Sequence, residues 1–183
     1  MLSDLTPEID GKMRKFKRIL LSYADFKHAK LASSIILTEQ FHDKYPQESY
    51  VILEALNCSM IVAYCRPFSG NNSRVPDLPA RLLKCLNSSE QEVHHVVMQD
   101  RNKVLAHSDS DALQIEPVIW HVAGRAMVLP LKNWGLAPLT KDATAVFHSA
   151  AEKLFTAIRE ERQRLEPQLI PYMRVADPEN PFS

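Results

Sequence analysis

Glycine and cysteine are both scarce in this sequence of 183 residues, which has four glycines and three cysteines. Few glycines beside many alanine, leucine, lysine and glutamate residues favour helices over sheets. The cysteines, Cys58, Cys65 and Cys85, form neither a Cys-x-x-Cys pair nor a Cys/His finger spacing, which argues against a metal or redox site. We therefore expect no cofactor and no metal, with Cys58 and Cys65 as buried reduced thiols on a helix.

An excess of one charge is also absent, because 22 basic residues balance 22 acidic residues and the pI is about 7.1. This balance excludes the broad basic surface of a general nucleic-acid-binding protein, so any contact with RNA must be local. The chain opens without a signal-peptide pattern, and its apolar runs are expected to be shorter than a bilayer span. The sequence predicts a cytoplasmic protein with no membrane contact.

Hydrophobic periodicity divides most of the chain into helices. Thr6 and Pro7 are typical of a helix start, with an apolar face that includes Leu20. A second helix is expected to begin between residues 22 and 25. The stretch 47–66 is apolar nearly all round, which is typical of a helix at the centre of a bundle.

Proline and glycine mark the breaks that follow. Residues 67–79 carry several prolines and a glycine, so a loop is expected there. A short helix over 79–86 comes next, and Ser88 or Ser89 then caps another helix. The last long helix is expected to begin after the cap Thr140 and to be closed by Pro167, with an extended tail over 167–183.

Residues of about 113–132 change the pattern, because they are rich in β-branched and aromatic side chains on both sides of an Ala-Gly-Arg turn. They predict a β-hairpin, which Pro117 and Pro130 confine to an edge or a surface insertion. The sequence therefore predicts a mainly α fold: an antiparallel helical bundle with a small β-hairpin inserted before the last long helix. We expect one domain over 1–183 with its core at about 7–166.

The residues with the most chemical potential run from Arg101 to His107 and into a Ser/Asp turn, at the end of the helix predicted to begin at Ser88 or Ser89. At about 100° per residue, Asp100 lies about 20°, His107 about 40° and Arg101 about 80° from Val93 on the helical wheel. All three therefore sit on or beside the apolar stripe that Val93 forms with other valines, Val96 among them. A guanidinium matches phosphate, and an imidazole exchanges protons near neutral pH.

Several other polar residues can support this pair. Glu54, Asn57 and Tyr64 share one face of the apolar helix, where a buried Glu54 requires a partner such as Arg101. Arg101 and His107 can also be a purely structural pair, with Arg101 bridging to an acid and His107 capping the helix end.

Three further features bear on function. His94 and His95 resemble a metal-binding dipeptide, but neighbours on a helix point about 100° apart, so no metal is expected there. Trp120 either stacks on RNA bases or pins the hairpin to the bundle. The charged run 159–162 is expected to be a solvated helix face.

The motif Arg101-Asn102-x4-His107 at the end of a bundle helix resembles the HEPN superfamily, whose hallmark is Arg, then commonly Asn, Asp or His, then His after four to six residues. The following Ser-Asp turn is similar to the abortive-infection-associated, AbiU-like branch. The resemblance implies a metal-independent endoribonuclease that cleaves RNA through its 2′-hydroxyl, with Arg101, His107 and Asn102 as catalytic residues. It also implies a homodimer, a toxin or antiviral role and a cognate antitoxin.

A second hypothesis keeps the bundle without the catalysis. Because catalytically inactive HEPN proteins are common, the chain can equally be an interaction or nucleotide-binding module that dimerises. A third hypothesis places a small-molecule site beneath the loop 67–79.

Overall fold

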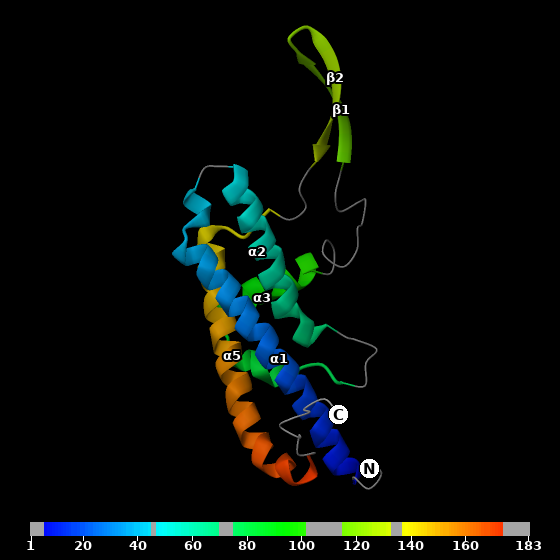
Figure 1. Ribbon diagram of the computed structural model, residues 1–183, viewed down its shortest axis with the longest axis vertical. Helices are drawn as coiled ribbons and strands as arrows, with labels where there is room; N and C mark the ends of the chain where they lie inside the picture. Colours follow the sequence, from blue (N-terminus) through cyan, green and yellow to red (C-terminus); the bar gives the residue numbers. More distant parts are fainter. Residues whose placement is uncertain (1–5, 45–46, 70–74, 102–114, 133–136, 174–183) are drawn as a thin grey trace, which may run out of the picture.

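The computed structural model describes residues 6–44, 47–69, 75–101, 115–132 and 137–173. In these ranges four long helices form a bundle and two strands form a hairpin (Figure 1). The long helices are α1 (Pro7–Thr38), α2 (Gln47–Cys65), α3 (Ser88–Asp100) and α5 (Lys141–Leu169); the strands are β1 (Ile115–Val122) and β2 (Arg125–Lys132); and the 3₁₀ helices are η1 (Phe41–Asp43), η2 (Arg66–Phe68), η3 (Ala80–Cys85) and η5 (Ile170–Tyr172). The mainly helical bundle with a hairpin before its last long helix is confirmed.

Helix α1 is one continuous helix of 32 residues, so the predicted second helix beginning at residues 22–25 is wrong. Its start is as expected: Pro7 is the first helical residue, and the Thr6 hydroxyl caps it. Neither glycine nor proline interrupts residues 22–25, and Ser22 is buried on the same face as the apolar residues before and after it. The buried face of α1 is slightly rotated from the predicted apolar face, since Leu20, which was predicted on that face, is 40% exposed.

Helix α1 packs against both α5 and α2 and runs antiparallel to each (Figure 1). Two polar contacts fix the register with α5: Lys30 Nζ lies 2.7 Å from Glu152 Oε1, and Ser33 Oγ lies 3.0 Å from His148 Nδ1. The sequence number rises in α1 while it falls in α5, as an antiparallel pair requires. The hydrogen bond between His28 Nε2 and Ser59 Oγ, at 2.7 Å, joins α1 to α2.

Three helices contribute one aromatic ring each to the centre of the core. Tyr64 of α2 lies edge-on to Phe26 of α1, with ring centroids 5.7 Å apart, and 4.9 Å from Phe147 of α5. All three side chains are fully buried. Tyr64 is therefore a core residue.

Helix α2 buries one face, not its whole surface. Tyr50, Val51 and Ile52 are exposed at its N-terminal end, so the prediction of a helix surrounded by the bundle fails there. The stretch Gln47–Phe68 is nevertheless long and apolar enough to cross a membrane by length and composition, contrary to the expectation from the sequence. About 44% of its most apolar window is buried in the bundle, and core helices of soluble proteins pass the same test.

A buried arginine fastens the segment that precedes η3. Arg18 of α1 donates from Nε to the carbonyl oxygen of Pro76 at 2.7 Å and from a terminal nitrogen to that of Val75 at 3.4 Å. The hollow between these residues and Leu78 has a volume of about 30 Å³. That volume suits a water molecule and is far below a small-molecule site, so the described part of 67–79 gives no support to a ligand site there.

Helix α5 continues through Pro167 to Leu169, and η5 follows, so the prediction that Pro167 closes the helix and begins an extended tail is wrong up to Tyr172. A proline in the last turn removes only one backbone hydrogen bond. Residues 174–183 of the predicted tail lie outside the described residues. Thr140 caps the helix as expected, through a hydrogen bond from the N–H of Ala143.

The hairpin is a regular antiparallel pair whose last partners are Val122 and Arg125. Its two-residue turn has positive φ at both positions, 51° at Ala123 and 77° at Gly124. This is the backbone of a type I′ turn, in which glycine is favoured because it lacks a Cβ. The two strands of the predicted insertion are confirmed, and residues 113–114 lie outside the described ranges.

A small side chain lets α5 pack closely in the bundle at Ala150, which is completely buried. We predict that Ala150→Leu lowers the free energy of unfolding by about 1–3 kcal/mol, because the larger side chain overpacks the core. Ala145→Leu, on the exposed face of the same helix, is expected to change it by less than about 0.5 kcal/mol. Urea denaturation measures both values, and equal effects would contradict the packing argument.

Candidate functional site

The helix that carries Arg101 begins with a capping box. The Asn87 side chain accepts a hydrogen bond from the Glu90 N–H at 2.9 Å, and Glu90 Oε2 accepts one from the Asn87 N–H at 2.8 Å. The cap is therefore Asn87, and the prediction of Ser88 or Ser89 is wrong. An Asn followed by Glu three positions later is the sequence signal for this arrangement, and it was missed.

Glu90 also ties the start of α3 to α5. It is only 2% exposed, yet its carboxylate accepts hydrogen bonds from Ser149 Oγ at 2.7 Å and from Lys153 Nζ at 2.8 Å. Burial alone would raise the pKa of Glu90, but the hydrogen bonds from Lys153, the Asn87 N–H and Ser149 together hold it below its ordinary value. A buried carboxylate is stable here because each of its oxygens is paired.

One turn further along α3, His94 lies against the core aromatic Tyr64. The Tyr64 hydroxyl is 3.2 Å from His94 Nδ1, and the imidazole is perpendicular to the Phe68 ring at 5.0 Å. Burial, and secondarily the charge of His95, lowers the pKa of His94, so the imidazole is neutral near pH 7. Burial likewise raises the pKa of Tyr64.

The end of α3 meets the end of α2 at Cys65. The Cys65 thiol lies 3.5 Å from the carbonyl oxygen of Val97, and both residues are fully buried. Burial raises the pKa of Cys65 to about 12, while the nearby Arg101 guanidinium opposes that rise and the Asp100 carboxylate adds to it. Both charged side chains are half-buried and close enough to Cys65 to act on its thiol.

The buried face of α3 differs from the stripe expected from the sequence. It consists of Glu90, His94 and Val97, whereas Val96 is 44% exposed. On the wheel this face is centred near 70° from Val93, about 10° from Arg101. The helical wheel therefore puts Arg101, at the end of α3, in line with the three buried residues. The error arose because hydrophobicity alone cannot identify a buried Glu and a buried His.

The structure describes only part of the predicted site. Asn102 and His107 lie outside the described residues, so their predicted catalytic roles stay predictions. Arg101 and Asp100 are described, and both lie near Cys65. The ion pair predicted between Glu54 and Arg101 also stays a prediction. The half-buried Glu54 lies near Cys58, whose pKa is raised by burial and then by the Glu54 charge.

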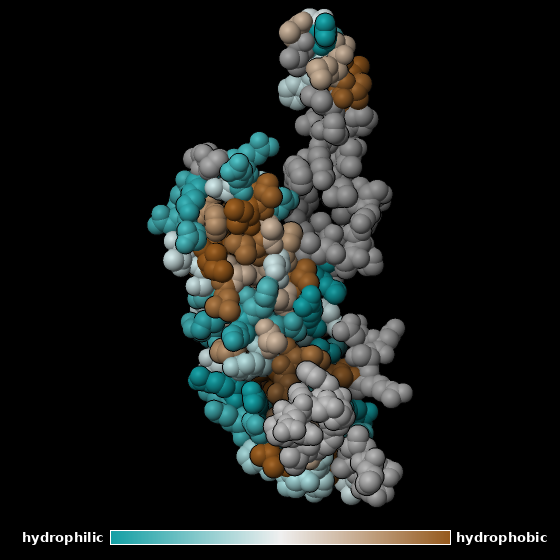
Figure 2. All heavy atoms as spheres, in the orientation of Figure 1, coloured by the Kyte–Doolittle hydropathy of each residue, from teal (hydrophilic) through white to brown (hydrophobic). Residues whose placement is uncertain are grey.

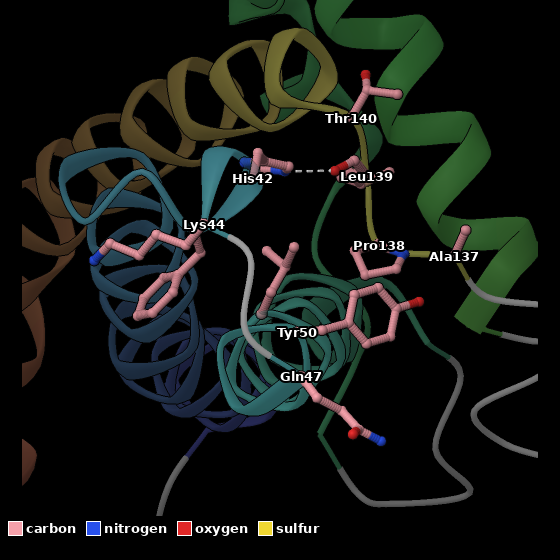
Figure 3. A pocket seen from close by; sticks show the side chains of 10 residues that line it. His42, Lys44, Gln47, Tyr50, Ala137, Pro138, Leu139 and Thr140 are labelled. Carbon is pink, nitrogen blue, oxygen red and sulfur yellow. Dashed lines mark hydrogen bonds between the residues drawn. The ribbon is translucent and has the colours of Figure 1, made fainter.

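Two supporting residues have structural roles. Tyr64 packs in the core, as described above. Asn57 is buried, and its side-chain oxygen accepts a hydrogen bond from the Leu139 N–H at 3.1 Å. The carbonyl oxygen of Leu139 in turn accepts a hydrogen bond from His42 Nε2 at 2.8 Å (Figure 3). Asn57 therefore fixes the chain between the hairpin and α5.

A cavity of about 590 Å³ opens beside Leu139, and Figure 3 shows His42, Tyr50 and Pro138 around it. Most of its lining is apolar: Phe41, Tyr50, Leu53, Ala137, Pro138 and Leu139 contribute, with His42, Lys44, Gln47 and Thr140 as the polar members. Tyr50 is separated from Cys65 by about 22 Å of helical rise along α2. The cavity and the Arg101 region are therefore two different places.

Two expectations about charged and aromatic residues are corrected. Glu161, expected on a solvated face, is largely covered and pairs with Arg81 of η3 at 2.6 Å and with Arg164 at 2.7 Å. Trp120 is half exposed on the hairpin, which stands away from the helices in Figure 1, so it does not pin the hairpin to the bundle. The remaining hypothesis for Trp120, base stacking, stays a prediction.

Among the described residues, no group of three His, Cys, Asp or Glu side chains is placed to hold a metal ion. Comparison with known proteins found no matching family model, no matching curated protein and no matching solved structure. The HEPN resemblance therefore depends on the motif at 101–107 and on its place at the end of a bundle helix.

The buried Glu90 network yields a stability prediction. Glu90→Ala removes the cap partner and leaves Ser149 and Lys153 without their shared acceptor, so the free energy of unfolding should fall by about 2–3 kcal/mol. Glu92→Ala, at an exposed position on the same helix, should change it by less than about 0.5 kcal/mol. Thermal and urea unfolding of both variants provide the comparison; a stable Glu90→Ala protein would show that α3 is held by other contacts.

The lowered pKa of His94 yields a pH prediction. Because the folded pKa is below the ordinary value of about 6.5, the unfolded chain binds the proton more readily, and stability is lost as the pH falls below about 6.5. His94→Gln should flatten this loss between about pH 6.5 and 5. His95→Gln, at the exposed neighbour, should retain it. Urea midpoints across this range measure the slopes; identical slopes in wild type and His94→Gln would contradict the assignment.

Proposed function

We propose that this protein is a HEPN-like, metal-independent endoribonuclease whose phosphate-binding arginine is Arg101. The observation that supports this is the position of Arg101, which continues the buried face of a helix anchored by Glu90, His94 and Val97. Anchoring of this kind holds a catalytic group in a fixed geometry, which phosphoryl transfer requires. The proposed site needs a positive charge at Arg101 but no broad basic surface, which agrees with the zero net charge of the chain.

The proposed reaction is an internal transesterification. The ribose 2′-oxygen attacks the adjacent phosphorus, the bond from phosphorus to the 5′-oxygen breaks, and the products carry a 2′,3′-cyclic phosphate and a 5′-hydroxyl. His107 removes the 2′-OH proton or protonates the departing 5′-oxygen. Arg101 binds the phosphate and the charge that grows on it in the transition state. The need for a 2′-OH selects RNA over DNA.

The remaining parts of the proposal concern setting and partners. Asn102 orients the segment that follows it or faces a second protomer. A homodimer would bring two copies of Arg101 to one cleft and raise the local positive charge. A cytoplasmic toxin or antiviral role, controlled by a cognate antitoxin, follows from the same resemblance.

One observation favours the second candidate, a non-catalytic interaction module. The hairpin presents large apolar side chains to solvent, and exposed apolar patches mark interaction surfaces. In that case Arg101 is a structural residue, so Arg101→Ala lowers the free energy of unfolding and RNA is not cleaved by the wild-type protein.

Cleavage of single-stranded RNA in the presence of EDTA tests the proposal, with 2′,3′-cyclic phosphate ends as the chemical signature. His107→Ala should abolish cleavage, and Arg101→Ala should slow it by about 10²–10³-fold, the usual effect of removing a donor that stabilises transition-state charge. Arg159→Ala, at an exposed position on α5, serves as the matched control and should cleave like the wild type.

Full activity in His107→Ala would sink the site assignment. An inactive wild type together with a destabilised Arg101→Ala would favour the interaction module instead.

A further inference from the structure

The hairpin carries an exposed apolar pair on each of its faces. Ile119 is paired with Val128, and Trp120 with Met127. Directly opposed residues project to the same face, and successive residues alternate between faces. Ile119 and Val128, which are 68% and 70% exposed, therefore form one apolar face, and the half-exposed Trp120 and Met127 form the other.

The described part of the hairpin does not rest on the bundle. Figure 1 shows β1 and β2 projecting beyond the ends of the helices. A single two-stranded hairpin is at best marginally stable in water, because it has no second layer on which to bury its apolar side chains. A surface that covers one of its faces would supply that layer.

The bundle itself carries a complementary surface, which we call the α1–α2 patch: Leu31 and Ile35 of α1 with Val51 and Ile52 of α2, all about half exposed. The His28–Ser59 hydrogen bond fixes how these helices align. Ile35 lies seven residues after His28 in α1, and Ile52 lies seven residues before Ser59 in α2. Because seven residues make about two helical turns and the helices are antiparallel, we infer that these two side chains are neighbours across the helix pair. Figure 2 shows hydrophobic residues gathered over this part of α1 and α2.

We propose that the Ile119–Val128 face of the hairpin packs on the α1–α2 patch of a second copy of this chain, and that this reciprocal dimer is the homodimer of the proposed function. Two-fold symmetry then creates the contact twice, and the assembly closes. A specific interface buries at least on the order of 1,000 Å² in total, and both symmetric contacts count toward that area.

Charge agrees with this pairing. Arg125 is exposed at the tip of the hairpin, and Glu48 is exposed one helical turn before Val51 and Ile52. Arg125 and Glu48 therefore carry charges of opposite sign at the hairpin tip and at the α2 end of the patch, which favours their association. RNA is a poorer occupant for this face, because aliphatic side chains offer neither the phosphate contacts nor the aromatic stacking that RNA binding uses.

Sedimentation velocity of the full chain tests the interface with two single substitutions. Val128→Lys places a charge in the hairpin face, and Ile52→Glu places one in the patch. Wild type should be a dimer, and each variant alone should be a monomer with an unchanged circular dichroism spectrum, since both positions are exposed. Ile170→Glu, at an exposed apolar position on η5, is the control and should remain dimeric.

Mixing the two variants is the decisive experiment. The mixture restores one native contact, from the wild-type hairpin to the wild-type patch. In the second contact, the lysine introduced into the hairpin of one copy meets the glutamate introduced into the patch of the other. A dimer should therefore reappear in the mixture.

A monomeric wild type, dimers in both single variants, or a monomeric mixture would each overturn the proposal. A monomeric wild type whose RNA affinity falls in Val128→Lys would assign this face to RNA. The interface does not rest on the proposed catalysis, so an inactive His107→Ala that still dimerises separates the two.

Discussion

The position of α3 depends on one buried anion. The Glu90 carboxylate completes the capping box that starts the helix and accepts hydrogen bonds from two residues of α5. A carboxylate inside a bundle is tolerated only with a full set of partners. Glu90 therefore fixes both the rotation of α3 about its own axis and the position of α3 along α5. The contacts of His94 with Tyr64 and of Val97 with Cys65 then follow at the next turns of the same face. Arg101 is the next residue in that series.

The sequence predicted the architecture because the relevant signals are local. Thr6 and Thr140 cap their helices, and the β-branched and aromatic residues on both sides of the Ala-Gly-Arg turn mark the hairpin. The errors are also physical. No residue between 22 and 25 breaks a helix, so α1 continues, and Pro167 removes a single hydrogen bond in a last turn, so α5 continues as well.

The candidate site was harder to predict than the fold, because its supports are polar residues that meet across helices. Hydrophobic periodicity placed Val96 inside and gave no weight to Glu90 or His94, yet the burial is the reverse. Asn57 was predicted as a possible supporting residue because it shares a helix face with Glu54, and the contact that the structure gives its side-chain oxygen is the N–H of Leu139. A pattern on one helix shows which residues share a face, whereas the partner of each polar group is decided by the tertiary packing.

Leu139 has a consequence for how this chain can change over evolution. Its N–H is held by Asn57 and its carbonyl oxygen by His42, so the backbone is fastened to α2 and η1 just before α5 begins. Because of these two hydrogen bonds, we expect changes in the sequence or length of the hairpin to leave the register between α5 and α1 unaltered. The bundle can therefore keep its packing while the hairpin gains, loses or exchanges residues, which leaves the hairpin open to acquiring a new specificity.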